Sequence, residues 1–170
     1  MKSLIKNVRV IDPSVGIDEV SDILIDGEVI AEVGKNIECS DAEVLDRSGC
    51  IAVPGDIHVH LRDPGQEYKE TIETGTAAAA HGGFTGICSM PNTSPTTDDA
   101  ATIDYVLDKA KQAHHCRVYP SGACTKGLKG ESLAEIGDMV SHGAVAFTDD
   151  GRGIQHAGMM RRVMDYAKMF

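Results

Sequence analysis

The pattern of apolar and polar positions along the chain changes near Cys50. Before that residue, short apolar runs alternate with turn residues, and the strand candidates cover residues 4–11 and 23–30. Within the second candidate, the pair Asp26-Gly27 is a strong hairpin signal, because a type I′ turn needs positive φ angles that Asp and Gly tolerate. We therefore expect residues 1–50 to form a small β-sheet that needs further strands to be stable.

After Cys50, apolar runs alternate with stretches of helical periodicity. Each run begins about 30 residues after the previous one, which is the length of a βα unit. The expected strands cover residues 51–60, 84–90, 117–122 and 143–148. The expected helices cover residues 70–80, 97–115, 132–141 and 156–170.

The clearest of these helices is predicted over residues 97–115. Ile103, Val106 and Ala110 recur at helical spacing and define one apolar face. Thr96 and Asp99 occupy capping-box positions at its start.

Four strand–helix pairs in sequence predict a parallel sheet. Right-handed crossovers then leave an open doubly wound sheet or a β/α barrel as the main architectures. A complete eight-stranded barrel takes about 250 residues, whereas this chain has 170. We expect an α/β fold in which residues 51–170 form four β/α units, half of a barrel, after the N-terminal strands of residues 1–50. The last helical stretch ends without a capping signal, so we expect the complete protein to continue beyond it.

Composition excludes several classes of protein. The net charge is -10, and no basic stripe is present to neutralise phosphates, so nucleic acid is not expected as a partner. The five cysteines lack C-x-x-C spacing, which favours reduced thiols over a disulfide framework or a thiolate zinc site. No segment approaches the roughly 18 apolar residues that cross a bilayer. We expect a cytoplasmic protein without membrane contact.

The segment PGDIHVHLRDPG, residues 54–65, carries the strongest candidate chemistry. On a strand, His58, His60 and Arg62 project to one face, while residues 57, 59 and 61 pack on the other. Two imidazoles one pleat apart can share a metal ion. Chance alternation on a solvated strand is the alternative, but the apolar run before the pair, Asp56, and the Pro-Gly break after it favour a metal site at the strand's C-terminal end.

Two other expected strands also end in polar residues. The fourth ends in Thr148-Asp149-Asp150-Gly151, where a carboxylate could coordinate or bridge divalent metals. The alternative is an ordinary Asp-Gly turn. After the second strand, Asn92 could offer its amide to a substrate carboxylate or carbonyl, or it could simply be a turn residue beside Pro91. Their positions match that of the histidine pair, which favours a shared site.

Three segments resemble the type I dihydroorotases of the amidohydrolase superfamily. They are PGDIHVHLRDPGQEYKETIETGTAAAAHGGFT, MPNTSPTT and AFTDDGRGIQHAGMM. The resemblance covers essentially the whole chain, and the run that begins HVHLRDPG is highly specific. It implies the first half of a TIM-like (β/α)8 barrel, preceded by part of a small composite β-sandwich.

The resemblance also implies roles for individual residues. His58 and His60 would be zinc ligands, and Asp150 would be a third, often bridging, ligand in a site of one or two zinc ions. Arg62 and Asn92 would hold the substrate carboxylate. Two further histidine ligands and the acid/base aspartate are expected beyond the residues given, so the remainder of the chain would be required.

The activity implied is the reversible, zinc-dependent cyclisation of N-carbamoyl-L-aspartate to L-dihydroorotate in pyrimidine biosynthesis. Hydantoinases and allantoinases are the enzymatic alternative, but these usually carry a carboxylated lysine where this chain has residues 148–150. Their substrates also mostly lack the ring carboxylate that Arg62 would bind. A noncatalytic scaffold for aspartate transcarbamoylase is a further alternative, although such proteins typically lose metal ligands that are retained here.

The expected partners are a small-molecule substrate, further copies in a homo-oligomer, and aspartate transcarbamoylase as an additional candidate. Residues 1–170 alone are expected to be inactive and poorly folded, because half of the site would be missing and the edge of a half-barrel would be exposed.

Overall fold

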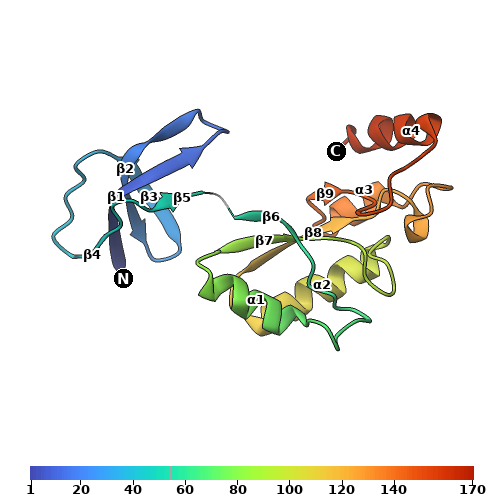
Figure 1. Cartoon of the computed structure of the whole chain (residues 1–170), viewed down its shortest axis with the longest axis horizontal. Helices are drawn as coiled ribbons and strands as arrows, with labels where there is room; N and C mark the ends of the chain where they lie inside the picture. The colour runs from blue at the N-terminus through green and yellow to red at the C-terminus, as the bar shows by residue number, and fades with distance from the viewer. Residues whose placement is uncertain (54) are drawn as a thin grey trace. The chain divides into compact units, whose positions relative to one another are not determined.

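The computed structural model describes residues 1–53 and 55–170, which fall into two compact units, Met1–Pro54 and Gly55–Phe170 (Figure 1). Pro54, the first residue of the PGDIHVHLRDPG motif, lies outside the described residues. None of the helices among the described residues is both long and apolar enough to span a membrane.

The first unit is a five-stranded mixed sheet. Its strands are β1 (Lys2–Asp12), β2 (Ile17–Asp26), β3 (Val29–Gly34), β4 (Ala42–Asp46) and β5 (Ile51–Ala52). The order is β3-β2-β1-β4, and β5 also pairs with β1. Neighbours β1, β2 and β3 run antiparallel, whereas β4 and β5 run parallel to β1. Val8, Val10 and Ile23 are buried together at its core.

The expected hairpin is present, but its turn differs from the prediction. Asp26 pairs with Val29, so the two-residue loop is Gly27-Glu28 rather than Asp26-Gly27. Gly27 alone of these residues has a positive φ, of 63°. A type I′ turn centred on Asp26-Gly27 is therefore wrong, because Asp26 still belongs to the ladder of β2.

The apolar run of residues 51–60, expected as one strand, is divided between the two units. Ile51 and Ala52 pair with Arg9 and Val10 in the first sheet. The second part forms β6 (Asp56–Val59), which belongs to the other sheet. Ladder pairing with β1 therefore draws the start of the run into the N-terminal unit, a choice that hydrophobicity alone does not reveal.

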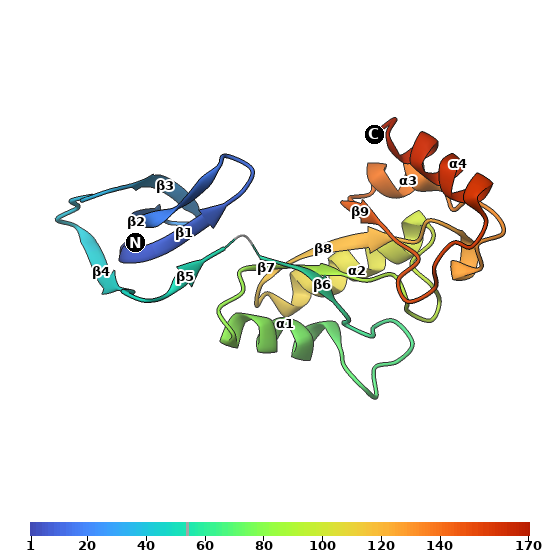
Figure 2. The ribbon, with the colours of Figure 1, turned by 45° about the horizontal axis from the view of Figure 1, so that its top comes forward.

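The second unit is built around a parallel sheet of order β6-β7-β8-β9. After β6 come β7 (Gly86–Ser89), β8 (Arg117–Gly122) and β9 (Ala146–Phe147). The helices are α1 (Ile72–His81), α2 (Ala100–Ala113), α3 (Ile136–Ser141) and α4 (Ala157–Ala167), with a 3₁₀ turn η1 (Lys126–Leu128). Strands and helices alternate as predicted, and Figure 2 shows α1 and α2 on the same side of β6, β7 and β8.

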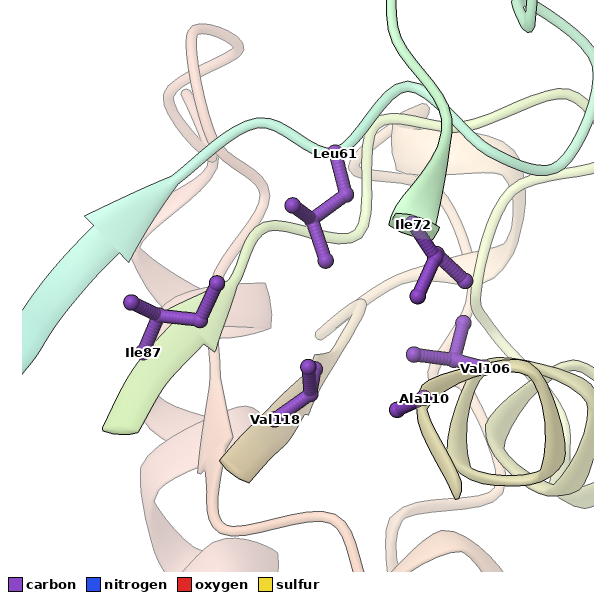
Figure 3. Close-up of a cluster of buried hydrophobic side chains, with 6 residues drawn as sticks. All are labelled: Leu61, Ile72, Ile87, Val106, Ala110 and Val118. Carbon is purple, nitrogen blue, oxygen red and sulfur yellow. The ribbon is translucent and has the colours of Figure 1, made fainter. Parts of the chain in front are cut away.

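The main core of this unit lies between those two helices and the sheet (Figure 3). Its six buried side chains come from the β6–α1 connection, α1, β7, α2 and β8; they are Leu61, Ile72, Ile87, Val106, Ala110 and Val118. Val106 and Ala110 confirm the apolar face predicted for α2. This packing holds β7 and the connection after β6, next to the polar residues that follow β6 and β7. Strand β9 packs through Phe147 in two other clusters.

Helix α2 begins later than predicted. Its N-cap is Asp99, whose side chain accepts a hydrogen bond of 2.9 Å from the Thr102 backbone N–H. Thr96 lies outside the cap, so the Thr96–Asp99 capping box is wrong. An acidic N-cap satisfies the first free N–H groups directly and needs no reciprocal partner.

Candidate metal centre

The polar residues singled out by the sequence lie where parallel strands end. His58 is in β6, His60 follows it directly, Asn92 follows β7, and Asp150 follows β9. Carboxyl ends of parallel strands meet at one edge of a sheet, and ligand sites of open and closed α/β folds form there. The parallel sheet thus brings three segments, which are about 30 or more residues apart in the sequence, together at one edge.

His58, His60 and Asp150 form a group that could hold a metal ion. The His58 Nε2 lies 3.1 Å from Asp150 Oδ1, and the His60 Nε2 lies 3.8 Å from Asp150 Oδ2. One potential ligand atom from each residue falls within 4.8 Å of the other two. The Asp150 side chain is only 11% exposed. Two imidazole nitrogens and one carboxylate oxygen are a donor set that suits zinc and similar divalent cations.

Asn92 contacts two members of this group. Its Oδ1 lies 2.9 Å from His60 Nδ1, and its Nδ2 donates a 2.7 Å hydrogen bond to Asp150 Oδ2. The amide therefore links His60, which follows β6, to Asp150, which follows β9.

Arg62 borders the same region, although it does not lie on the strand. Strand β6 ends at Val59, and Arg62 has a φ of 61°, so the backbone has already turned. Arg62, Asn92 and Asp150 line a cavity of about 400 Å³. The Arg62 side chain therefore lies at the same cavity as Asn92 and the proposed metal ligand Asp150.

The opposite face of the motif only partly follows the predicted alternation. Leu61 is buried and Val59 packs against the core, but Ile57 is 83% exposed. Packing of Ile57 on that face is therefore wrong. The register between β6 and β7 shifts between Asp56 and Val59, and such an irregularity breaks regular alternation.

The two aspartates that follow β9 have different environments. Asp149 is buried, at 7% exposure, and its Oδ1 accepts hydrogen bonds of 2.9 Å from Cys124 N and 3.0 Å from Thr125 N. Its Oδ2 accepts a further bond from the Thr125 hydroxyl. Asp149 thus ties the β8 loop to the end of β9, and Asp150 is left to face the histidines.

A family model for dihydro-orotase-like proteins matches residues 49–169. This chain belongs to the dihydroorotase-like family. It is 60% identical to a dihydroorotase from Syntrophotalea carbinolica and 51% identical to one from Ruminiclostridium cellulolyticum, over its whole length in both cases. It spans 40% of the length of each of these relatives.

Solved structures extend the comparison of this dihydroorotase-like chain. An L-hydantoinase (dihydropyrimidinase) from Arthrobacter aurescens superimposes with a TM-score of 0.71 at 25% identity, covering 99% of this chain and 39% of that one. A dihydroorotase structure gives a TM-score of 0.52 at 14% identity, with 99% and 48% covered, which bears on the fold alone. The predicted α/β fold with half of a TIM-like barrel is confirmed.

Three polar residues of this dihydroorotase-like chain were not given roles from the sequence. Arg152 lines the cavity with Arg62, and its only sequence signal is its place two residues after Asp150. Asp63 is buried and accepts hydrogen bonds from Ile72 N at 3.3 Å and from the Tyr105 hydroxyl at 2.8 Å. Burial, and then the neighbouring Asp63, raise the pKa of Tyr105 to about 12. No pattern in the sequence connects Tyr105 to the motif 42 residues earlier.

Proposed function

We propose that the protein containing this chain catalyses the reversible interconversion of N-carbamoyl-L-aspartate and L-dihydroorotate at a zinc site. The observation that carries the proposal is the convergence of His58, His60 and Asp150 beside Arg62 and Asn92, in a chain of the dihydroorotase-like family. The reaction would be a step of pyrimidine biosynthesis, as the sequence resemblance implies.

His58, His60 and Asp150 would hold the metal. Their donor set fits zinc, and the two carboxylate oxygens of Asp150 are compatible with one or two ions. A bound zinc ion would supply Lewis-acid polarisation of the substrate's amide carbonyl. Two further histidine ligands and the acid/base aspartate would come from the remainder of the chain, as the resemblance implies.

Arg62 would fix the substrate through its carboxylate. A guanidinium presents paired N–H donors that match a carboxylate bidentately. Asn92 would contribute the amide hydrogen that Asp150 does not accept. Holding the ring from this side of the cavity would align its carbonyl with the ligand group and lower the entropic cost of reaction.

The second candidate activity is hydrolysis of hydantoin-type rings. The superposition on an L-hydantoinase favours it. Against it, residues 148–150 carry no lysine, and Arg62 has no role with rings that lack a carboxylate. A noncatalytic scaffold is a less economical proposal, because all three ligand residues are retained and lie together. A homo-oligomer and contact with aspartate transcarbamoylase stay predictions from the resemblance.

The deciding experiment uses the purified full-length protein, loaded with zinc. Its steady-state turnover would be compared on dihydroorotate, hydantoin and allantoin, with the bound metal counted by elemental analysis. We expect turnover of dihydroorotate, a KM for it at least 10-fold higher in Arg62→Gln, and little activity on the other two rings. Preference for hydantoin would support the second candidate, and absence of both metal and turnover would support the scaffold.

A further inference from the structure

Hydrogen bonds hold Asn92 and its loop between the ends of two strands. Its own loop is fixed because Thr93 N and Thr97 N both donate to the Pro91 carbonyl, at 2.8 and 3.1 Å. This loop is also bound to the loop that follows β6, through a 3.0 Å hydrogen bond from Ser94 N to the Pro64 carbonyl. A Cβ at Gly65, where φ is 89°, would collide with the Ser94 carbonyl oxygen, so only glycine permits this approach.

The contacts of Asn92 determine which way its amide faces. The Asn92 NH₂ donates to the carboxylate oxygen Oδ2 of Asp150, at 2.7 Å. The Asn92 carbonyl oxygen then faces His60 Nδ1 at 2.9 Å. A carbonyl oxygen only accepts, so His60 Nδ1 must carry the proton.

This proton assignment leaves the other ring nitrogen of His60 free. In a neutral imidazole with a proton on Nδ1, Nε2 holds the lone pair that binds a metal. The Nε2 of His60 is the nitrogen on the side of Asp150, 3.8 Å from its Oδ2. The hydrogen bonds of Asn92 therefore favour the tautomer and ring orientation that a metal ligand requires.

We propose that Asn92 is a positioning residue of the metal centre, which fixes the His60 tautomer and aligns His60 with Asp150. The proposal rests on the metal site of the proposed function and adds a role to the substrate contact expected of Asn92. The two roles are compatible, because the NH₂ has two hydrogens and Asp150 accepts only one. Outer partners of metal ligands typically change metal affinity by about 10–100-fold when they are removed.

The test measures zinc affinity of the full-length protein by competition with a chromophoric chelator. We expect Asn92→Ala to weaken zinc binding by about 10–100-fold. Arg62→Gln is the control for loss of a substrate contact, since Arg62 has no hydrogen bond to the ligand group, and it should keep wild-type zinc affinity. Thr93→Ala is the control for disturbance of the loop, because Thr93 contacts Pro91, Pro95 and Thr97 rather than the ligands, and it should stay within about 3-fold.

A second measurement keeps the test valid if Asn92→Ala folds poorly. The ¹⁵N chemical shifts of the His60 ring, recorded on metal-free wild-type protein, report which nitrogen carries the proton. We expect the Nδ1–H form. Wild-type zinc affinity in Asn92→Ala, or an Nε2–H form of His60, would overturn the inference. Failure of the wild-type protein to bind zinc at all would instead overturn the proposed function.

Discussion

At the scale of single residues, the neighbouring aspartates Asp149 and Asp150 have different contacts and therefore different expected roles. The sequence placed Asp149 and Asp150 together at a strand end and assigned the metal to Asp150 only through resemblance. The structure supplies a physical reason for the distinction, because three donors from Cys124 and Thr125 already surround Asp149. Those donors come from a loop 24 to 25 residues earlier, so no local pattern could have revealed them.

The two aspartates should respond differently to the same substitution. In Asp149→Asn the amide oxygen can still accept from Cys124 N and Thr125 N, but an NH₂ replaces the oxygen that accepts from the Thr125 hydroxyl. Loss of the charged acceptor should lower the free energy of unfolding by about 1–3 kcal/mol. Asp150→Asn should change stability by less than about 1 kcal/mol and remove most zinc binding. Urea unfolding and zinc titration of the full-length variants check this. Equal loss of stability in both would contradict the division of roles.

At the scale of elements, periodicity predicted helices and strands well where one face packs on one core. The apolar face of α2 was read correctly because Val106 and Ala110 contact the sheet through a regular helical repeat. The start of α2 was not predicted correctly, because it depends on the hydrogen bond of a single N-cap residue. The outer face of β6 was not predicted correctly either, because the register shifts within its pairing with β7. Arg62 illustrates the same limit: it reaches the cavity from a backbone turn rather than from strand alternation.

The contact between Tyr105 and Asp63 joins α2 to the loop that carries Arg62. Burial of Tyr105, and then this contact, should make stability depend on pH. The pKa of Tyr105 is raised to about 12 in the folded protein, above its ordinary value of 10.0. A raised folded-state pKa means that the contribution is complete below pH 10 and is lost as pH rises from 10 toward 12. Wild-type protein should therefore lose more stability over this range than Tyr105→Phe does.

Urea unfolding of the two proteins at pH 9, 10 and 11 measures that difference. Other groups that titrate in this range, including Cys124 with its pKa raised to about 11 by burial, are common to both proteins and cancel. Tyr105→Phe should also be less stable than wild type at pH 9, because the buried Asp63 loses a donor. Parallel pH profiles would show that ionisation of Tyr105 is not linked to folding.

At the scale of the whole molecule, the repeat of about 30 residues was enough to predict the parallel sheet. Right-handed crossovers alone do not determine the strand order, because a doubly wound sheet and a barrel both use them. The resemblance to the family favoured the barrel, whose consecutive order β6-β7-β8-β9 is present. The exact junction between the two units could not be predicted from the sequence, because Ile51 and Ala52 belong to the same apolar run as the strand that follows them. Their assignment depends on pairing with β1, which is a long-range contact.

The same architecture predicts how residues 1–170 would behave when expressed alone. Among the described residues, β9 pairs with β8 only, so its other edge has free backbone groups. Beside β9, an apolar groove is lined by Phe147, Met160 and Met164. The described residues supply three proposed ligands, and the chain spans 40% of the length of its relatives. We expect weak zinc binding, no turnover, and self-association that increases with protein concentration.

Sedimentation velocity at several concentrations, with zinc titration and a dihydroorotate assay, would check this in comparison with the full-length protein. The full-length protein should bind zinc more tightly by at least about 100-fold, because each additional imidazole ligand adds both a bond and preorganisation. Turnover by residues 1–170, or cooperative unfolding of a monomer, would contradict the expectation. Turnover would mean that four β/α units already form a complete site. Cooperative unfolding of a monomer would mean that they cover the free edge of β9 themselves.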